Sequence, residues 1–65
     1  MIGERIKALR IEKGITQQQF ADLMSVAKST VGMWETNKRE PDIETLKQIA
    51  KIFDTPFYFL LNDTI

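Results

Sequence analysis

Seven of the nine basic side chains lie within the first 39 residues, where they could bind an anion. Only four acidic residues accompany them, so this part carries a charge of +3 and residues 40–65 carry the compensating −3. The seven are Arg5, Lys7, Arg10, Lys13, Lys28, Lys38 and Arg39. A separation of this kind can direct one face of a protein toward phosphates, although a charged run can also simply solvate a surface. A nucleic-acid partner is therefore compatible with zero net charge.

Residues suited to catalysis are scarce. The chain has no histidine and no cysteine, and it holds neither a glycine-rich phosphate loop nor carboxylates at metal-ligand spacing. We therefore expect no enzyme, no cofactor, no metal site and no small-molecule ligand. No apolar run reaches the roughly 18 to 20 residues of a membrane span, and no signal peptide is evident, so we expect a soluble, cytoplasmic protein.

The first half of the chain predicts three short helices. Ile2, Ile6 and Leu9 form one apolar stripe, which predicts a helix over residues 2–13 that Gly14 ends. Thr16 and Gln19 fit a capping box that starts a second helix, ending near residue 24. This second helix is expected to bury Phe20, Ala21 and Met24.

A bend at Ser25 and Val26 separates this helix from a third one over residues 28–36. Val31 and Trp34 are spaced to point inward from it. The residues expected on its outward side are Lys28, Ser29, Gly32, Met33 and Thr36.

The second half predicts two further helices. Asp42 is a good N-cap for a fourth helix, and Thr55-Pro56 begins a short last helix that ends near Leu61. The apolar stripe of the fourth helix is Ile43, Leu46, Ile49, Ala50 and Phe53. The sequence therefore predicts a single all-α domain over residues 1–65 with five helices. A chain of this length buries only about 60% of its unfolded surface, so the core must be simple.

The stretch from Thr16 to Glu35 resembles the helix-turn-helix of the lambda-repressor-like (Cro/repressor, XRE-type) DNA-binding family. The resemblance rests on the leading Thr16-Gln17, Ala21 in the middle of the second helix, the apolar Val26 in the turn and the closing Glu35. It extends over nearly the whole chain, from about Ile6 to Leu61. It implies a five-helix lambda-repressor-like fold, with the helix-turn-helix at about residues 16–36, whose partner is double-stranded DNA.

The resemblance also implies roles for individual residues. The third helix is expected to contact bases in the major groove, and the residues before and after it are expected to contact phosphates. The expected base contacts are Lys28, Ser29 and Met33, with Thr30 and Gly32 as secondary candidates. The expected phosphate contacts are Gln17, Thr36, Asn37, Lys38 and Arg39, and Arg10 could lie near a phosphate as well. Family members often pair an arginine and a glutamate at the positions of Arg10 and Glu35, which implies a structural ion pair.

Three residues depart from the family pattern or from helix chemistry. Ser25 stands where the family usually has glycine, and Ala27 stands where it often has serine or threonine. Gly32 lies inside a helix, at a cost of roughly 0.5 to 1 kcal/mol relative to alanine. Its missing side chain could allow close approach to DNA, or the glycine could be neutral.

The apolar run Phe57 to Leu61 is longer than one face of a short helix can bury. We expect Phe57 and Leu60 to point inward. The remaining side chains, Tyr58, Phe59, Leu61 and Ile65, form a candidate homodimer interface. The alternative is that this segment only caps the core.

The prediction is a sequence-specific transcriptional regulator, a repressor of prokaryotic or phage type that binds a two-fold operator as a dimer. The alternative is a protein-interaction module of the same fold, such as an antitoxin-like or scaffold domain. Operator sequence, regulated gene, repression versus activation, oligomeric state and chain completeness stay open at this point.

Overall fold

Five helices and no strand make up residues 2–61, the part of the chain that the computed structural model describes. They are α1 (Ile2–Glu12), α2 (Gln17–Met24), α3 (Lys28–Glu35), α4 (Ile43–Ile52) and α5 (Phe57–Leu61). The all-α prediction is confirmed, and each helix begins and ends within about a residue of its predicted position. No helix of residues 2–61 is long and apolar enough to cross a membrane.

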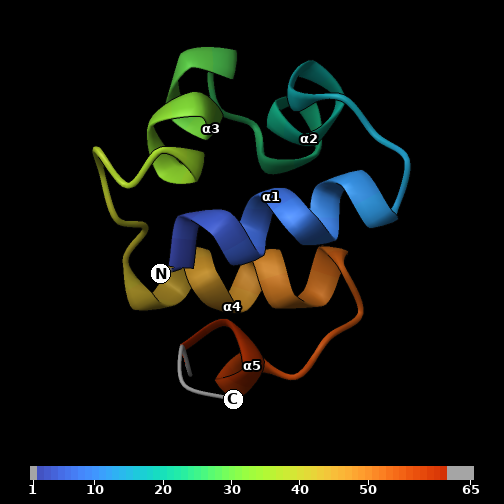
Figure 1. Ribbon diagram of the computed structural model, residues 1–65, viewed down its shortest axis with the longest axis vertical. Helices are drawn as coiled ribbons and strands as arrows, with labels where there is room; N and C mark the ends of the chain where they lie inside the picture. Colours follow the sequence, from blue (N-terminus) through green and yellow to red (C-terminus); the bar gives the residue numbers. More distant parts are fainter. Residues whose placement is uncertain (1, 62–65) are drawn as a thin grey trace.

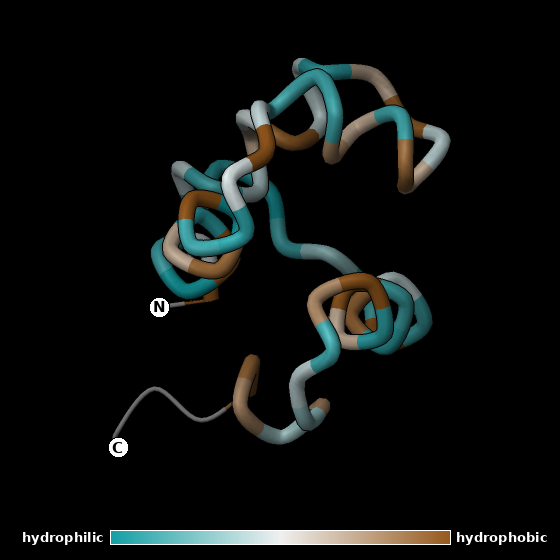
Figure 2. Tube along the Cα trace, turned by 90° about the vertical axis from the view of Figure 1, so that its right-hand side faces the viewer, coloured by the Kyte–Doolittle hydropathy of each residue, from teal (hydrophilic) through white to brown (hydrophobic). Residues whose placement is uncertain are grey.

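In Figure 1, α2 and α3 lie at the top, α1 and α4 cross the middle one below the other, and α5 lies at the bottom. In the view of Figure 2, α1 and α4 are seen end-on at opposite sides, with α2 and α3 above them and α5 below. Apolar side chains from all five helices fill the space between. Phe20 of α2 is fully buried and lies against two aromatic rings, at 4.9 Å from Phe53 and 6.2 Å from Trp34 between ring centroids. Phe20 thus links the helix-turn-helix to the end of α4.

The predicted helix ends have clear physical causes. The Thr16 hydroxyl accepts from the Gln19 N–H at 3.0 Å, and the Thr16 N–H donates to the Gln19 side chain at 2.8 Å, so the capping box is confirmed. Gly14 adopts the left-handed conformation expected of a helix stop. At the start of α4, an Asp42 carboxylate oxygen accepts from the Thr45 N–H at 2.8 Å.

One residue of the predicted core lies elsewhere. Ile43 was expected on the buried stripe of α4, yet it is 53% exposed. It is the first residue of the helix, and Pro41, two residues earlier, is buried instead. The other four residues of the stripe are buried as expected, including Phe53, which caps the helix end.

Candidate nucleic-acid interface

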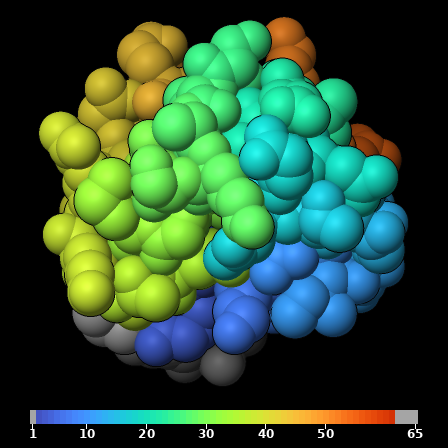
Figure 3. Space-filling view, turned by 90° about the horizontal axis from the view of Figure 1, so that it is seen from above, coloured from blue at the N-terminus to red at the C-terminus, as the bar shows by residue number. Residues whose placement is uncertain are grey.

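The connection between α2 and α3 is a rigid bend. Ser25 has a left-handed backbone with φ 59°, and its N–H donates to the carbonyl oxygens of Ala21 and Asp22. The Val26 N–H bonds to the Ala21 carbonyl oxygen as well, at 3.0 Å. These bonds satisfy the last carbonyls of α2 within a three-residue turn. Figure 3 shows α2 and α3 side by side on one face of the molecule.

The outer side of α3 is polar and accessible in its first turn. Lys28 and Ser29 are exposed in its first turn, whereas Thr30, Gly32 and Met33 are half-buried. A Cβ added at Gly32 would meet no atom within 4 Å, so packing within the protein does not require a glycine there. The inner side is apolar, since Val31 and Trp34 are buried as predicted.

The end of α3 is bound to α1 through charged groups. The Arg10 Nε lies 2.6 Å from Glu35 Oε2, and Arg10 Nη2 donates to Glu35 Oε1 at 3.3 Å. The remaining terminal nitrogen, Arg10 Nη1, donates to the Ile15 carbonyl oxygen at 2.8 Å. The Glu35 side chain is only 2% exposed, and the Arg10 side chain is 11% exposed. All three guanidinium nitrogens of Arg10 have partners within the protein, which gives Arg10 a structural role, and its predicted phosphate contact stays a prediction.

Gln17 belongs to the same network, which its sequence position did not reveal. Its Nε2 donates to Glu35 Oε1 at 3.0 Å, so Glu35 accepts from both α1 and α2. The Gln17 side chain is therefore held in one orientation at the first turn of α2 while it stays half-buried. An amide nitrogen carries two N–H groups, so one of them is left for a further acceptor.

The loop after α3 divides into two parts. Lys38 and Arg39 are exposed, and their backbone N–H groups donate to the Met33 carbonyl oxygen. Thr36 is exposed too, but its hydroxyl donates back to the Gly32 carbonyl oxygen at 2.8 Å. Asn37 instead directs its carboxamide to α1, where Oδ1 accepts from the Gly3 N–H and Nδ2 donates to Glu4. Its predicted phosphate contact stays untested.

The predicted dimer residues are not equivalent. Tyr58 is 67% exposed and Leu61 is 43% exposed, whereas Phe59 is half-buried. The Arg5 guanidinium lies 4.7 Å from the centre of the Phe59 ring and donates to the Phe59 carbonyl oxygen at 3.0 Å. Phe59 thus contributes to the contact between α1 and α5. Ile65 lies outside the described residues.

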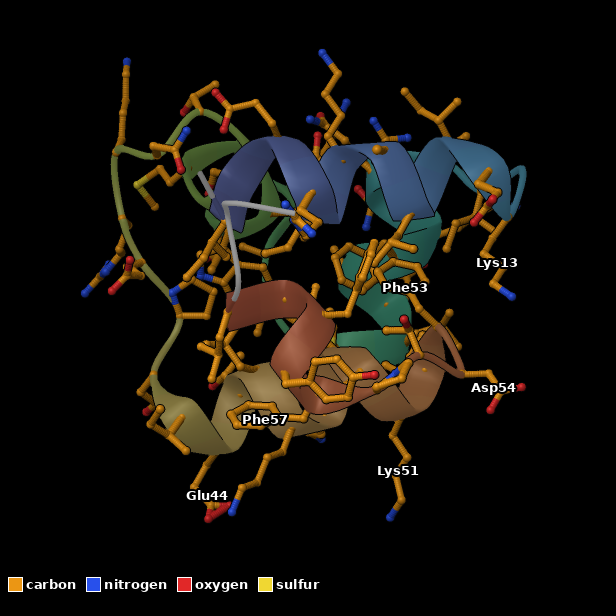
Figure 4. The ribbon with its side chains drawn as sticks, turned by 60° about the horizontal axis from the view of Figure 1, so that its bottom comes forward. Lys13, Glu44, Lys51, Phe53, Asp54 and Phe57 are labelled. Carbon is orange, nitrogen blue, oxygen red and sulfur yellow. The ribbon has the colours of Figure 1, made fainter. Side chains whose placement is uncertain are left out.

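A groove of 860 Å³ runs along α4 and the start of α5, lined in part by Lys47, Lys51 and Phe57. In Figure 4, Glu44 and Lys51 project from α4 away from the body of the protein, with Phe57 lying over the helix. The lining of this groove contains two acidic and two basic residues, so it lacks the uniformly positive charge that would favour an anion. Within residues 2–61, no three acidic side chains are placed to hold a metal ion.

Comparison with known proteins places this geometry in a family. A family model described as helix-turn-helix matches residues 6–60. The chain is 39% identical over 64 residues to the SPbeta prophage-derived HTH-type transcriptional regulator YonR of Bacillus subtilis, covering 98% of the chain and 59% of YonR. Among solved structures, SinR in complex with DNA matches with a TM-score of 0.87 at 36% identity. The match covers 95% of this chain and all of the SinR chain in that structure. The P22 c2 repressor bound to a synthetic operator matches with a TM-score of 0.89 at 28% identity, covering 98% of the chain and 97% of the repressor chain.

Proposed function

Because the chain belongs to the XRE-type helix-turn-helix family, we propose that it is a sequence-specific DNA-binding transcriptional regulator, and specifically a repressor. Relatives named transcriptional regulators and solved structures with DNA or an operator support this proposal. The chain spans about three fifths of the length of YonR, so the proposal concerns the part that would contact DNA.

The observation that carries the proposal is the exposed polar first turn of α3, held outward by a rigid bend. An α-helix with its side chains is about 10 to 12 Å across and fits a major groove about 12 Å wide. The Lys28 ammonium could donate to guanine O6 and N7, and the Ser29 hydroxyl could bond to several base edges. Thr30, Gly32 and Met33 lie further along α3, where Met33 could contact a thymine methyl group.

Phosphate contacts would flank this helix on both sides. Lys38 and Arg39 are the exposed cations that follow α3, and their contacts would supply affinity and salt dependence without sequence information. Gln17 lies at the N-terminal end of α2, whose partial positive charge favours an anion. Its bond to Glu35 fixes its direction before DNA arrives. Thr36, which is exposed, is the remaining candidate for a phosphate contact.

A homodimer would supply the specificity that one short helix lacks. Family members bind half-sites about one helical turn, roughly 34 Å, apart. Tyr58 and Leu61 are the exposed apolar side chains of α5 that a second copy could cover. Phe59 would contribute less, since it is half-buried and Arg5 lies over one face of its ring.

The test is selection of bound duplexes from a random pool at low salt. A repressor of this kind should enrich a short two-fold sequence. A plot of log affinity against log salt concentration should have a negative slope of about 0.9 for each phosphate contact. The alternative, a protein-interaction module, predicts no enrichment and no duplex binding. Symmetry of the enriched sequence would report a dimer, whereas a single half-site would argue against one.

A further inference from the structure

The N-terminal end of α1 lies directly on the C-terminal end of α3, at a contact made by Gly3 and Asn37. The Gly3 N–H donates to Asn37 Oδ1 at 3.0 Å, and Asn37 Nδ2 donates to Glu4 Oε1 at 3.1 Å. Gly3 is buried, although it lies in the first turn of an end helix. The two residues are 34 positions apart in sequence, so this is a tertiary contact.

The approach is too close for any side chain at Gly3. A Cβ there would overlap the Trp34 carbonyl oxygen and would lie 2.7 Å from Asn37 Oδ1. By comparison, a Cβ at Gly14 or Gly32 would meet nothing within 4 Å. Gly3 therefore sets how near α1 can come to the end of α3.

Asn37 contributes in two ways. Its backbone is left-handed with φ 61°, a conformation that asparagine and glycine tolerate better than other residues. Its carboxamide oxygen satisfies one of the free N–H groups at the start of α1, in the manner of an N-cap supplied from a distant part of the chain. The positive end of the α1 dipole also faces the negative end of α3.

Two polar contacts thus join the C-terminal end of α3 and the residues after it to α1, and they lie almost two turns apart on α1. One is the Gly3–Asn37 contact, and the other is the Arg10–Glu35 ion pair. Two separated contacts fix an angle between helices, which a single contact does not. We propose that Gly3 and Asn37 are positioning residues that set the angle of α3, and hence its sequence preference, without touching DNA. This inference rests on the proposed function.

The experiment compares Gly3→Ala and Asn37→Gly with the unaltered protein. Asn37→Gly tolerates the left-handed backbone and removes the side chain that bonds to Gly3 and Glu4. Ala8→Ser, a small neutral change at an exposed position of α1, serves as the control. Affinity is measured on the selected duplex and on a random duplex at one salt concentration. The ratio of the two affinities reports sequence preference.

We expect the ratio to fall by about 3- to 10-fold in Asn37→Gly, the range that loss of one or two hydrogen bonds gives. Gly3→Ala should lower it at least as much, and Ala8→Ser should leave it unchanged. Equal losses on both duplexes would instead make Asn37 a phosphate contact and overturn the inference. An unchanged ratio would overturn it too. If Gly3→Ala does not fold, Asn37→Gly alone decides.

A second readout needs no DNA. Residual dipolar couplings of the free protein give the angle between α1 and α3, which should change in Asn37→Gly and stay fixed in Ala8→Ser. If the unaltered protein binds no duplex, the proposed function is wrong. The measured angle between α1 and α3 would still show whether Asn37 positions α3. An unchanged angle would refute the positioning role.

Discussion

Arg10 on α1 and Glu35 at the end of α3 form an ion pair with 2.6 Å between Arg10 Nε and Glu35 Oε2, and both side chains are nearly excluded from solvent. Gln17 adds a third element to the same carboxylate. A buried pair of this kind contributes little net stability, but removing one partner leaves a buried charge unpaired. The pair therefore matters most for the placement of α3.

Replacement of Glu35 by alanine should destabilise the protein severely. We expect Glu35→Ala to lower the free energy of unfolding by about 3 to 5 kcal/mol, because the Arg10 guanidinium would stay buried without a counter-charge. The double variant Arg10→Met with Glu35→Leu should lose less than Glu35→Ala alone. Urea denaturation measures both, with Glu12→Ala as an exposed control on α1. A larger loss in the double variant would contradict this account.

The Asp42 cap should make stability depend on pH. Hydrogen bonds from the side chain and the backbone N–H of Thr45 hold the pKa of Asp42 below its ordinary value of 3.8. The folded state thus favours the charged carboxylate, whose contribution is complete above pH 3.8 and is lost as pH falls through the lower folded pKa.

The change that isolates this effect is Asp42→Asn, which still caps α4 but does not titrate. The unaltered protein should be the more stable of the two at neutral pH, and the difference should shrink between about pH 5 and pH 2. Denaturation midpoints at several pH values measure it. Asp54→Asn is the matched control at another exposed aspartate. A difference that is constant with pH would exclude the charge as its cause.

Alanine substitutions at Lys28 and Lys38 should change DNA binding in different ways. Loss of a base contact at Lys28 should weaken binding to the selected duplex by about 1 to 3 kcal/mol and relax sequence preference. Loss of a phosphate contact at Lys38 should weaken all duplexes about equally and lower the salt slope by about one. Binding titrations over a range of salt concentrations measure both. Equal losses on selected and random DNA for Lys28→Ala would refute base contact there.

A charge placed on α5 should prevent pairing of two copies. Tyr58→Glu and Leu61→Glu should weaken binding to a two-half-site duplex by about 100-fold, because coupled binding of two sites raises avidity by 10² to 10⁴. Binding to a single half-site should not change. Ile11→Glu introduces the same charge at a 58% exposed apolar residue of α1 and serves as the control. Sedimentation equilibrium then reports the mass of the complex, and unimpaired two-site binding would exclude this interface.

Ala27 leaves the start of α3 without a side-chain cap, although its backbone has the extended conformation of an N-cap residue. Ala27→Ser should therefore raise the free energy of unfolding by about 1 kcal/mol. Ala8→Ser, within α1, should give no such gain. Thermal or urea denaturation measures both, and an equal effect at the two positions would show that the gain does not come from capping.

Local chemistry decided where the helices begin and end. The hydroxyl of Thr16, the carboxylate of Asp42 and the glycine at position 14 act on atoms within a few residues, so the sequence alone predicts their effects. The inward positions Phe20, Val31 and Trp34 follow from helical periodicity in the same way. Periodicity was less reliable at Ile43. This residue begins α4, and its side chain is 53% exposed, whereas the later residues of the apolar stripe pack into the core.

Position within the folded protein decided the rest. In the sequence, Asn37 is one more polar residue beside Lys38 and Arg39. Only the tertiary structure shows that its carboxamide oxygen accepts a hydrogen bond from the Gly3 N–H. Gln17 and Phe59 are similar, since their partners Glu35 and Arg5 are 18 and 54 residues away. The sequence determined five helices, their caps and the polar outer side of α3, because these depend on neighbours along the chain. The angle at which α3 is held depends on contacts between α1 and α3, which exist only once the chain has folded.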